Sequence, residues 1–429
     1  MQKKSCGRNS KNQPIKLLSM ANRFSLDKNK IQVLLLEGIH QSAVNVFKEA
    51  GYTNIEYLKT ALEGAELEQK IKDVHIIGIR SRTNLSAEIL KKTKKLFAIG
   101  CYSIGTNQVD LAAAKNLGIP VFNAPFSNTR SVAELVIAEI ILLMREVPAK
   151  NAAAHRGVWL KAAKNSYEVR GKNLGIVGYG HIGTQVSILA ESMGMNVFYY
   201  DIEKKLNLGK AVACQSLEEL LRVSDAVTLH VPETELTANM ISAPQLAIMK
   251  KGGLLINASR GCVVDYVSVA EALKTGKLAG AAADVFPKEP SSNDDPFVSV
   301  LQEFDNVLIT PHIGGNTSEA QENIGLEVAE KLIRYSDNGS TVGAVNFPQV
   351  SLFPNHDKQR FLHIHKNIPG LLKDINFVFT NRGINIASQF LQTDTEIGYV
   401  IIDTESRDCD SILKELKKVP HTIRARMLY

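Results

Sequence analysis

The sequence GKNLGIVGYGHIGTQVSILAESMGMNVFYYD, at residues 171–201, decides the fold expected for the middle of this chain. An apolar run is followed by a glycine-rich turn, a helical stretch and a second apolar run that ends at Asp201. Gly178, Gly180 and Gly183 have the spacing G-x-G-x-x-G, which permits a tight turn and close approach of the backbone to a pyrophosphate. The N-terminus of the following helix offers free N–H groups to phosphates. The stretch therefore predicts a βαβ unit that binds a dinucleotide, and the alternative is a glycine-rich turn without a ligand.

Asp201 indicates which dinucleotide is bound. A carboxylate at the end of the second strand accepts hydrogen bonds from the ribose hydroxyls and would repel a 2′-phosphate, which favours NAD over NADP. His181 and Ile182 lie inside the glycine-rich turn. The sequence leaves open whether His181 contacts the cofactor or is merely exposed.

Strand-like and helix-like segments alternate on both sides of this unit, which predicts parallel sheets with right-handed crossovers. Two long helices are expected, at residues 131–147, where Pro148 would end the first, and at residues 318–336. They would bracket an inserted domain and form a hinge over a cleft. Before them, the predicted strands are 31–38, 74–80, 96–103 and 119–125, and the predicted helices are 41–52, 85–95 and 110–118.

The C-terminal part has the order βαββαβ, which is typical of a small ferredoxin-like domain. Its strands are expected at 360–367, 384–394, 397–404 and 422–429, and its helices at 369–383 and 408–419. The chain is thus expected to be an α/β protein with two Rossmann-like parallel-sheet domains and a third, smaller domain. The predicted parts are a disordered tail at 1–29, a substrate-binding domain at 30–126 and 317–345, an NAD-binding domain at 127–316, a linker at 346–358 and a regulatory domain at 359–429.

Composition excludes several classes of protein. The 429 residues are 45% apolar and 22% charged, as in ordinary soluble proteins of two or three domains. Residues 1–30 hold eight Lys and Arg against one Asp, so the rest of the chain carries −1 of the total +6, and nucleic acid is not an expected partner. Neither a signal peptide nor a membrane-spanning run is apparent. Five scattered cysteines indicate a reducing compartment, the cytoplasm, and no metal site is expected.

Three polar residues each follow a strand-like run, and in an open α/β sheet ligands bind outside the carboxyl ends of the strands. They are Arg260 in INASRG, Glu289 in DVFPKEP and His312 in TPHIGG. An arginine can grip a carboxylate, an imidazole can take a hydroxyl proton near pH 7, and a carboxylate beside it stabilises the imidazolium. The alternative without a catalytic function is a surface arginine for Arg260, a solvated acid for Glu289 and a core histidine for His312.

These motifs, in this order, resemble those of the D-isomer-specific 2-hydroxyacid dehydrogenases. GIRSRT, IGTNQVDL, FNAPFSNTRSVAE, HRGVW and the C-terminal HIHKNIPG…GINIASQ extend the resemblance over about residues 30–429, to the members with a C-terminal ACT domain. It implies oxidation of 3-phospho-D-glycerate to 3-phosphooxypyruvate, the first step of L-serine biosynthesis, with feedback inhibition by L-serine. Rival hypotheses are a dehydrogenase of another 2-hydroxy acid, such as 2-hydroxyglutarate, and a corepressor-type binding protein.

The resemblance also assigns residues. Arg260 would bind substrate, His312 would exchange the proton, and Glu289 would pair with His312. Asn123 would face the substrate. The substrate phosphate would be bound by Arg80, Ser81 and Arg82, and serine by His365, Asn367 and Asn385. The NAD site would comprise the three glycines with His181, Ile182, Asp201, Ala258, Ser259, Arg260, Asp284, His312, Ile313, Gly314 and Gly315. A homotetramer is expected, through the HRGVW segment with Trp159 and through paired ACT domains.

Overall fold

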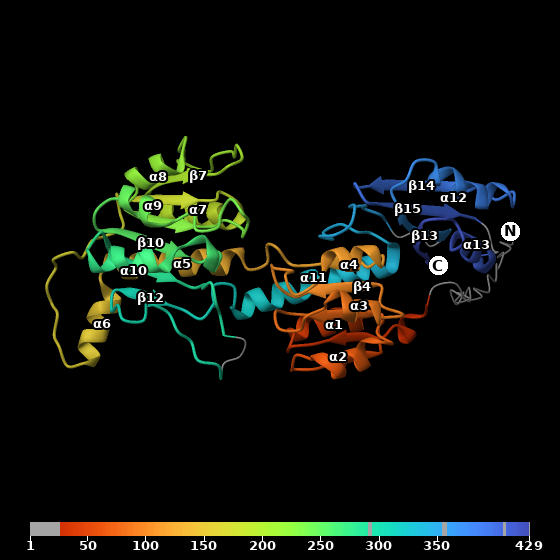
Figure 1. Ribbon diagram of the computed structural model, residues 1–429, viewed down its shortest axis with the longest axis horizontal. Coiled ribbons are helices and arrows are strands. Elements are labelled where there is room, and N and C mark those ends of the chain that lie inside the picture. Colours follow the sequence, from red (N-terminus) through yellow and green to blue (C-terminus); the bar gives the residue numbers. More distant parts are fainter. Residues whose placement is uncertain (1–25, 291–293, 354–357, 406–408, 429) are drawn as a thin grey trace, which may run out of the picture. The chain divides into compact units, whose positions relative to one another are not determined.

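The computed structural model describes residues 26–290, 294–353, 358–405 and 409–428, and its elements are labelled in Figure 1. Most of the predicted tail lies outside these residues. The chain divides into two compact units. One contains Ile31–Ile333 with Gly343–Asn346, and the other contains Arg334–Val342 and the residues from Phe347 onward.

The first sheet of the larger unit has five parallel strands in the order β2-β1-β3-β4-β5. Its central strands β1 and β3 are fully buried and consist mainly of Val, Leu and Ile, as expected for a parallel sheet. Glu37 and Arg80 follow the neighbouring strands β1 and β3, so both lie at the carboxyl edge. The elements are β1 (Val33–Leu35), α1 (Gln41–Glu49), β2 (Ile55–Tyr57), α2 (Gly64–Ile71), β3 (Ile76–Ile79), α3 (Ala87–Lys91), β4 (Ala98–Cys101), α4 (Leu111–Asn116) and β5 (Val121–Phe122).

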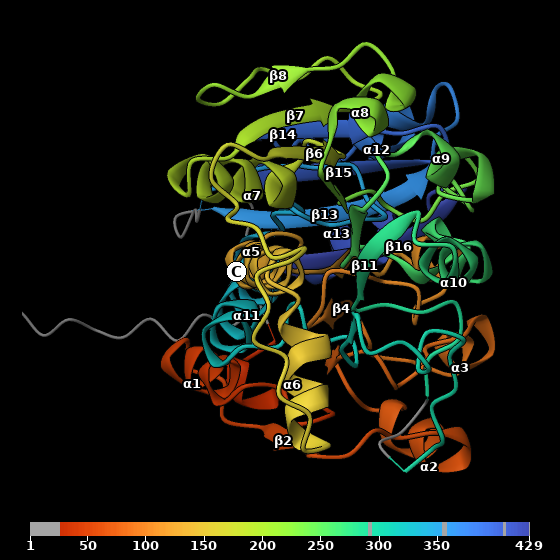
Figure 2. The same cartoon turned by 90° about the vertical axis from the view of Figure 1, so that its left-hand side faces the viewer.

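The second sheet has seven parallel strands in the order β12-β11-β10-β9-β6-β7-β8, and Figure 2 shows β8 as its edge strand beside β7. Its helices and strands are α5 (Thr129–Met144), α6 (Val147–His155), β6 (Asn173–Val177), α7 (His181–Ser192), β7 (Asn196–Tyr200), β8 (Val212–Ala213), α8 (Leu217–Val223), β9 (Ala226–Leu229), α9 (Ala243–Ile248), β10 (Gly253–Asn257), α10 (Tyr266–Lys274), β11 (Leu278–Ala283) and β12 (Val307–Ile309). The long helix α11 (Ser318–Asn338) follows β12.

The smaller unit contains a four-stranded antiparallel sheet in the order β14-β15-β13-β16. Phe361, Phe379, Val400 and Ile402 belong to the core that lies between this sheet and its two helices. The elements are β13 (Gln359–Lys366), α12 (Leu371–Thr380), β14 (Ile386–Thr393), β15 (Ile397–Thr404), α13 (Cys409–Leu416) and β16 (Thr422–Leu428). The predicted βαββαβ order and the predicted parallel sheets are confirmed.

One local prediction was wrong. Pro148 begins a helix rather than ending one, because it lies in the first turn of α6, where no N–H is needed. The break comes earlier, at Glu146, which adopts a left-handed conformation. The sequence also did not reveal β2 and α2. The strand β2 has three half-buried residues at the sheet edge, so its apolar signal is weak.

Residues 346–353 of the predicted linker at 346–358 are mostly buried, and residues 354–357 lie outside the described residues. Asn346 is buried and its side chain binds the backbone of Val121. Val350 and Leu352 are buried in the smaller unit, where their carbonyls accept hydrogen bonds from Ser340 and Asn338. The predicted domain boundaries remain predictions. No helix within the described residues is long and apolar enough to cross a membrane.

Candidate active site

The glycine-rich turn joins β6 to the N-terminus of α7, and its geometry explains the glycines. Gly178 has a φ of 90°, and a Cβ there would lie 2.3 Å from the carbonyl oxygen of His230. A Cβ on Gly183 would lie 2.2 Å from the carbonyl oxygen of Gly178. At Gly180, by contrast, a Cβ would meet nothing within 4 Å. The space in front of the α7 N-terminus is therefore open, as a bound pyrophosphate requires.

Asp201 is held against this turn. Its carboxylate accepts hydrogen bonds from the backbone N–H groups of Tyr179, at 2.8 Å, and of Glu203, at 2.9 Å. The strand β7, which precedes Asp201, pairs directly with β6. The predicted ribose-binding acid and the predicted phosphate-binding turn thus lie on neighbouring strands, and the residues present fit a bound NAD.

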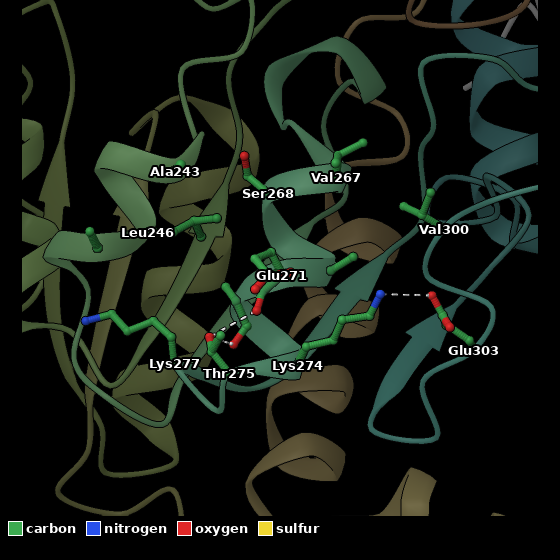
Figure 3. Close-up of a pocket in the computed structure, with 13 residues that line it drawn as sticks. Ala243, Leu246, Val267, Ser268, Glu271, Lys274, Thr275, Lys277, Val300 and Glu303 are labelled. Carbon is green, nitrogen blue, oxygen red and sulfur yellow. Dashed lines mark hydrogen bonds and ion pairs between the residues drawn. The ribbon is translucent and has the colours of Figure 1, made fainter.

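A hollow of about 510 Å³ lies beside the α7 N-terminus. Its lining includes His181, Thr184 and Glu327, and also Phe126, whose ring centroid lies 3.9 Å from that of His181. The sequence did not point to Phe126. The hollow drawn in Figure 3, lined by residues such as Leu246, Glu271 and Lys274, contains none of the predicted site residues and is not assigned to the chemistry.

The three catalytic candidates come from adjacent strands. Asn257, Ala283 and Ile309 are in register across β10, β11 and β12. The chain reaches Arg260 three residues after the first of these positions and His312 three residues after the last. Glu289 follows β11, and its Oε2 lies 2.8 Å from Nδ1 of His312. The structure therefore places an imidazole and a carboxylate in direct hydrogen-bond contact.

The environment of this pair shifts both titrations. The hydrogen bond with Glu289 is the main cause that raises the pKa of the His312 imidazole above its usual value. Partial burial acts to raise the pKa of the Glu289 carboxyl, but hydrogen bonds from His312 and from the Phe286 amide outweigh it and lower that pKa. The charge of Arg260 acts on both groups, lowering each pKa. Because the imidazole is 52% exposed, it remains accessible to a ligand.

The turn that carries Arg260 is fixed by two residues that the sequence did not reveal. Asn257 binds the N–H and hydroxyl of Ser259 through its Oδ1, and its Nδ2 donates to the carbonyl of Arg260. Tyr266 donates its hydroxyl proton to the carbonyl of Val285, at 2.7 Å. Asn257 and Tyr266 also bind each other, at 3.0 Å. They therefore join the INASRG turn to the DVFPKEP turn.

Asp284 fixes the loop that carries His312. It is 2% exposed, and its carboxylate accepts hydrogen bonds from the Thr310 hydroxyl and from the amides of Ile313 and Gly314. His312 itself is in the left-handed region, with a φ of 53°, and its N–H binds the Asp284 carbonyl at 2.8 Å. The observed contacts give Asp284 a positioning role, and its predicted contact with the cofactor remains a prediction.

Glu139, on α5, is a buried acid that the sequence reading missed. It is 3% exposed, and neither carboxyl oxygen has a hydrogen-bond partner among the described residues. Burial, reinforced by the charge of Asp284, raises the pKa of Glu139 to about 8. The side chain is therefore largely protonated at neutral pH, and no further negative charge is added beside Asp284.

The other predicted residues lie farther along the chain. Arg80, Ser81 and Arg82 follow β3 at the carboxyl edge of the five-stranded sheet. Asn123 follows β5 and donates through Nδ2 to the carbonyl of Ile104. Of the remaining predicted cofactor residues, Ala258, Ser259, Ile313 and Gly315 belong to the turns already described, whereas Ile182, expected inside the glycine-rich turn, lies in the first turn of α7.

The predicted regulatory residues do not all lie close together within one chain. His365 is opposite Gly398 on β15, and its buried ring lies where a Gly398 side chain would be. Asn367 follows β13 at this end, and its Nδ2 binds the carbonyl of Asp394. Asn385 precedes β14, whose first residue is opposite Thr404, six positions farther along β15. Because a strand rises about 3.3 Å per residue, the two asparagines lie on the order of 20 Å apart.

Comparison with known proteins identifies the family. The family described as D-isomer specific 2-hydroxyacid dehydrogenase, NAD binding domain, matches residues 137–314, and an AHAS small subunit-like ACT domain matches residues 361–424. D-3-phosphoglycerate dehydrogenase of Haemophilus influenzae is 60% identical over 410 residues, covering 96% of this chain and 100% of that protein. The enzyme of the same name from Dictyostelium discoideum is 47% identical over 405 residues, covering 94% and 99%.

Solved structures agree with this assignment. D-lactate dehydrogenase from Aquifex aeolicus, complexed with NAD and lactic acid, has a TM-score of 0.64 and 28% identity, and the match covers 74% of this chain and 100% of that one. D-2-hydroxyisocaproate dehydrogenase has a TM-score of 0.66 and 25% identity, and the match covers 74% of this chain and 100% of that one. The chain belongs to the D-3-phosphoglycerate dehydrogenases, within the D-isomer-specific 2-hydroxyacid dehydrogenase family.

Proposed function

We propose that the chain catalyses the NAD-dependent oxidation of 3-phospho-D-glycerate to 3-phosphooxypyruvate, the first step of L-serine biosynthesis. The observation that carries the proposal is the His312–Glu289 hydrogen bond, with Arg260 close enough to influence both groups. These residues follow strands of the same parallel sheet as the glycine-rich turn, at the same carboxyl edge. An acid–base group is thus placed at the edge where a dinucleotide binds.

Each residue has a role that follows from its chemistry. NAD⁺, held by the glycine-rich turn and Asp201, would supply the acceptor for the hydride of the alcohol carbon. His312 takes the hydroxyl proton, for which the ring must start neutral, and Glu289 stabilises the imidazolium that results. Arg260 holds the substrate carboxylate in a bidentate contact. In the reverse direction the protonated His312 returns the proton to the carbonyl oxygen.

Selectivity for a phosphorylated acid is assigned to the segment Arg80–Ser81–Arg82. Neither guanidinium has an acidic partner among the residues that the structure describes. Arg82 and Ser81 are exposed, and the segment lies at the carboxyl edge of its sheet. Two arginines and a hydroxyl group suit the oxygens of a phosphate dianion.

The test is NADH consumption with a panel of 2-oxo acids: 3-phosphohydroxypyruvate, 2-oxoglutarate and glyoxylate. We expect the highest kcat/KM with the phosphorylated acid. A clear preference for 2-oxoglutarate or glyoxylate would assign a different physiological substrate. Absence of turnover with all three would favour the binding-protein hypothesis.

Feedback inhibition by L-serine is assigned to the ACT domain. Amide and imidazole groups suit an amino acid, because amide oxygens accept from its ammonium while amide and ring N–H groups donate to its carboxylate. The strand register keeps Asn385 far from Asn367 within one chain. The proposed site therefore requires two copies, one supplying His365 and Asn367 and the other supplying Asn385.

An oligomer has support on two surfaces. Val158, Trp159 and Leu160 are consecutive and exposed, with Trp159 at 85%, and exposed apolar groups of this kind mark interfaces. The strand β14 is an edge of its sheet and exposes Phe390 and Leu391. We assign a homotetramer built on these two surfaces, in the cytoplasm, with neither nucleic acid nor membrane as a partner. Sedimentation of the full chain and of Trp159→Glu, which should yield smaller species, tests the assembly.

A further inference from the structure

The loop after β1 contains an acid in an unusual backbone conformation. Glu37 has a φ of 61°, in the left-handed region that a residue with a long side chain rarely adopts. Such a conformation costs energy and persists only where the surrounding structure enforces it. Its backbone N–H is bound to the carbonyl of Thr60, at 3.0 Å, which fixes the turn from the side of β2.

The Glu37 side chain explains why this conformation is kept. Its Oε1 accepts hydrogen bonds from the amides of Arg80, at 3.0 Å, and Thr83, at 2.9 Å, and its Oε2 accepts one from the amide of Arg82, at 2.9 Å. The carboxylate thus lies in a ring of three backbone N–H groups from the segment proposed to bind phosphate. Hydrogen bonds from N–H groups to an ionised carboxylate are among the strong ones in proteins.

These bonds have a consequence for the two arginines. A carboxylate near two guanidinium groups would ordinarily pair with one of them. Here the backbone amides occupy both carboxylate oxygens, and neither Arg80 nor Arg82 has an acidic partner among the described residues. The arginine side chains therefore remain available to an anion, while their backbone is held in one conformation.

The same segment is fixed from its other side. The side-chain amide of Gln108 donates to the carbonyl of Arg80, and it also lies 3.2 Å from the Ser103 hydroxyl. Both polar groups of the Arg80 backbone are therefore engaged, the N–H by Glu37 and the carbonyl by Gln108. Neither residue needs to touch the substrate for this effect.

We propose that Glu37 is a positioning residue for phosphate selectivity: by binding the amides of Arg80, Arg82 and Thr83, it presents the two arginines to the phosphate of the substrate. The inference rests on the proposed function, because that function assigns the segment to phosphate. Preorganisation of a binding group raises the affinity for ligands that contact this group, and it leaves the affinity for other ligands unchanged. Glu37 should therefore matter for a phosphorylated acid and not for its unphosphorylated analogue.

The experiment compares 3-phosphohydroxypyruvate with hydroxypyruvate, which lacks only the phosphate, in the full-length enzyme. Glu37→Gln replaces one acceptor oxygen by an NH₂ group that would face backbone N–H groups. We expect the KM for the phosphorylated acid to rise roughly 10-fold or more, the usual worth of a hydrogen bond to a charged group, with kcat at saturation little changed. The kcat/KM for hydroxypyruvate should stay at the wild-type value. Glu66 is an exposed acid on α2, and Glu66→Gln is the matched control, which should leave the kinetic constants for both substrates unchanged.

Turnover of hydroxypyruvate serves as the measure of folding in each variant. Loss of turnover with both substrates in proportion, in Glu37→Gln and in the milder Glu37→Asp alike, would make Glu37 merely structural and overturn the inference. So would an unchanged preference for the phosphorylated acid in Glu37→Gln.

Arg82→Ala separates failure of this inference from failure of the proposed function. A strong wild-type preference that is lost in Arg82→Ala but kept in Glu37→Gln refutes the role of Glu37 alone. A wild type without preference, unaffected by Arg82→Ala, refutes the phosphate assignment and the role of Glu37 with it.

Discussion

The catalytic candidates and the regulatory candidates are distributed differently in their sheets. Arg260, Glu289 and His312 follow parallel strands, whose carboxyl ends all lie at one edge, and their charges act on one another. Asn367 and Asn385 flank two strands that run in the same direction on either side of β15. Since one asparagine follows its strand and the other precedes its strand, they lie at opposite ends of the sheet.

This difference has a consequence for assembly. A parallel sheet can build a site within one chain. Every crossover returns the chain to the amino edge of the sheet, so all strands end at the same carboxyl edge. In the small antiparallel sheet, the proposed serine-binding residues would form one site only if a second copy supplied the residue from the opposite end of the sheet. Chemistry is therefore expected to need one folded chain, and regulation to need a pair.

The largest expected effect concerns the catalytic candidates, which lie within one chain. Replacing His312 by Ala removes the proton acceptor, so turnover should fall by on the order of 10²–10⁴. The glycine-rich turn and Asp201 are untouched, so NADH binding, followed by fluorescence titration, should stay within a factor of about two. Near-normal turnover in this variant would remove His312 from the mechanism.

The second prediction tests whether the regulatory set is shared between copies. Asn367→Ala and Asn385→Ala should each raise the serine concentration needed for half-inhibition by roughly 10-fold or more, as expected for loss of a hydrogen bond to a charged group, without loss of turnover. A mixed oligomer of the two variants has one site that lacks both asparagines and one that is intact. Mixing should therefore restore part of the inhibition, whereas a site within one chain would show no recovery.

A truncation sharpens the same comparison. Ending the chain near Lys358 removes the ACT domain and should abolish inhibition while catalysis continues. The measurement is the initial rate against serine concentration at saturating substrate. Equal inhibition of the full-length and truncated enzymes would place serine elsewhere, for example in the active site.

The next prediction concerns the cofactor. Replacing Asp201 by Ser removes the charge that would repel a 2′-phosphate, so the ratio of kcat/KM for NAD over NADP should fall roughly 10-fold or more. The matched control is Glu203→Gln, an exposed acid two residues away. A wild type that already prefers NADPH would contradict the assignment of Asp201.

The smallest effect is a displacement along the pH axis. Glu289→Gln removes the carboxylate that raises the pKa of His312, so this pKa should fall. Oxidation needs the neutral ring and is lost as pH falls through its pKa, so its acid limb should move to lower pH. Reduction needs the protonated ring, so its alkaline limb should move to lower pH as well. Unchanged limbs in both directions would separate Glu289 from His312.

The local sequence was sufficient where a motif has a single structural solution. Gly183 is required by a close contact with the carbonyl of Gly178 inside one βαβ unit, and Asp201, which binds the amide of Tyr179, ends the same unit, so residues 171–201 contain both of these contacts. Apolar periodicity also predicted the alternation of strands and helices around the two parallel sheets, apart from β2 and α2, and the βαββαβ order of the small domain. The sequence did not predict the short edge strand β2, because its residues are half-buried and carry only a weak apolar pattern.

Tertiary structure alone decided which distant residues support the site. Asn257, Tyr266 and Asp284 bind turns that are far apart in the chain, Glu139 lies buried near Asp284, and Glu37 binds amides more than forty residues away. No local pattern distinguishes these side chains from ordinary polar residues, because their roles depend on partners that only the folded sheets bring near. The sequence by itself determined the types of residue available for the chemistry, whereas the fold determined their contacts, since strand order and register decide which strand ends become neighbours.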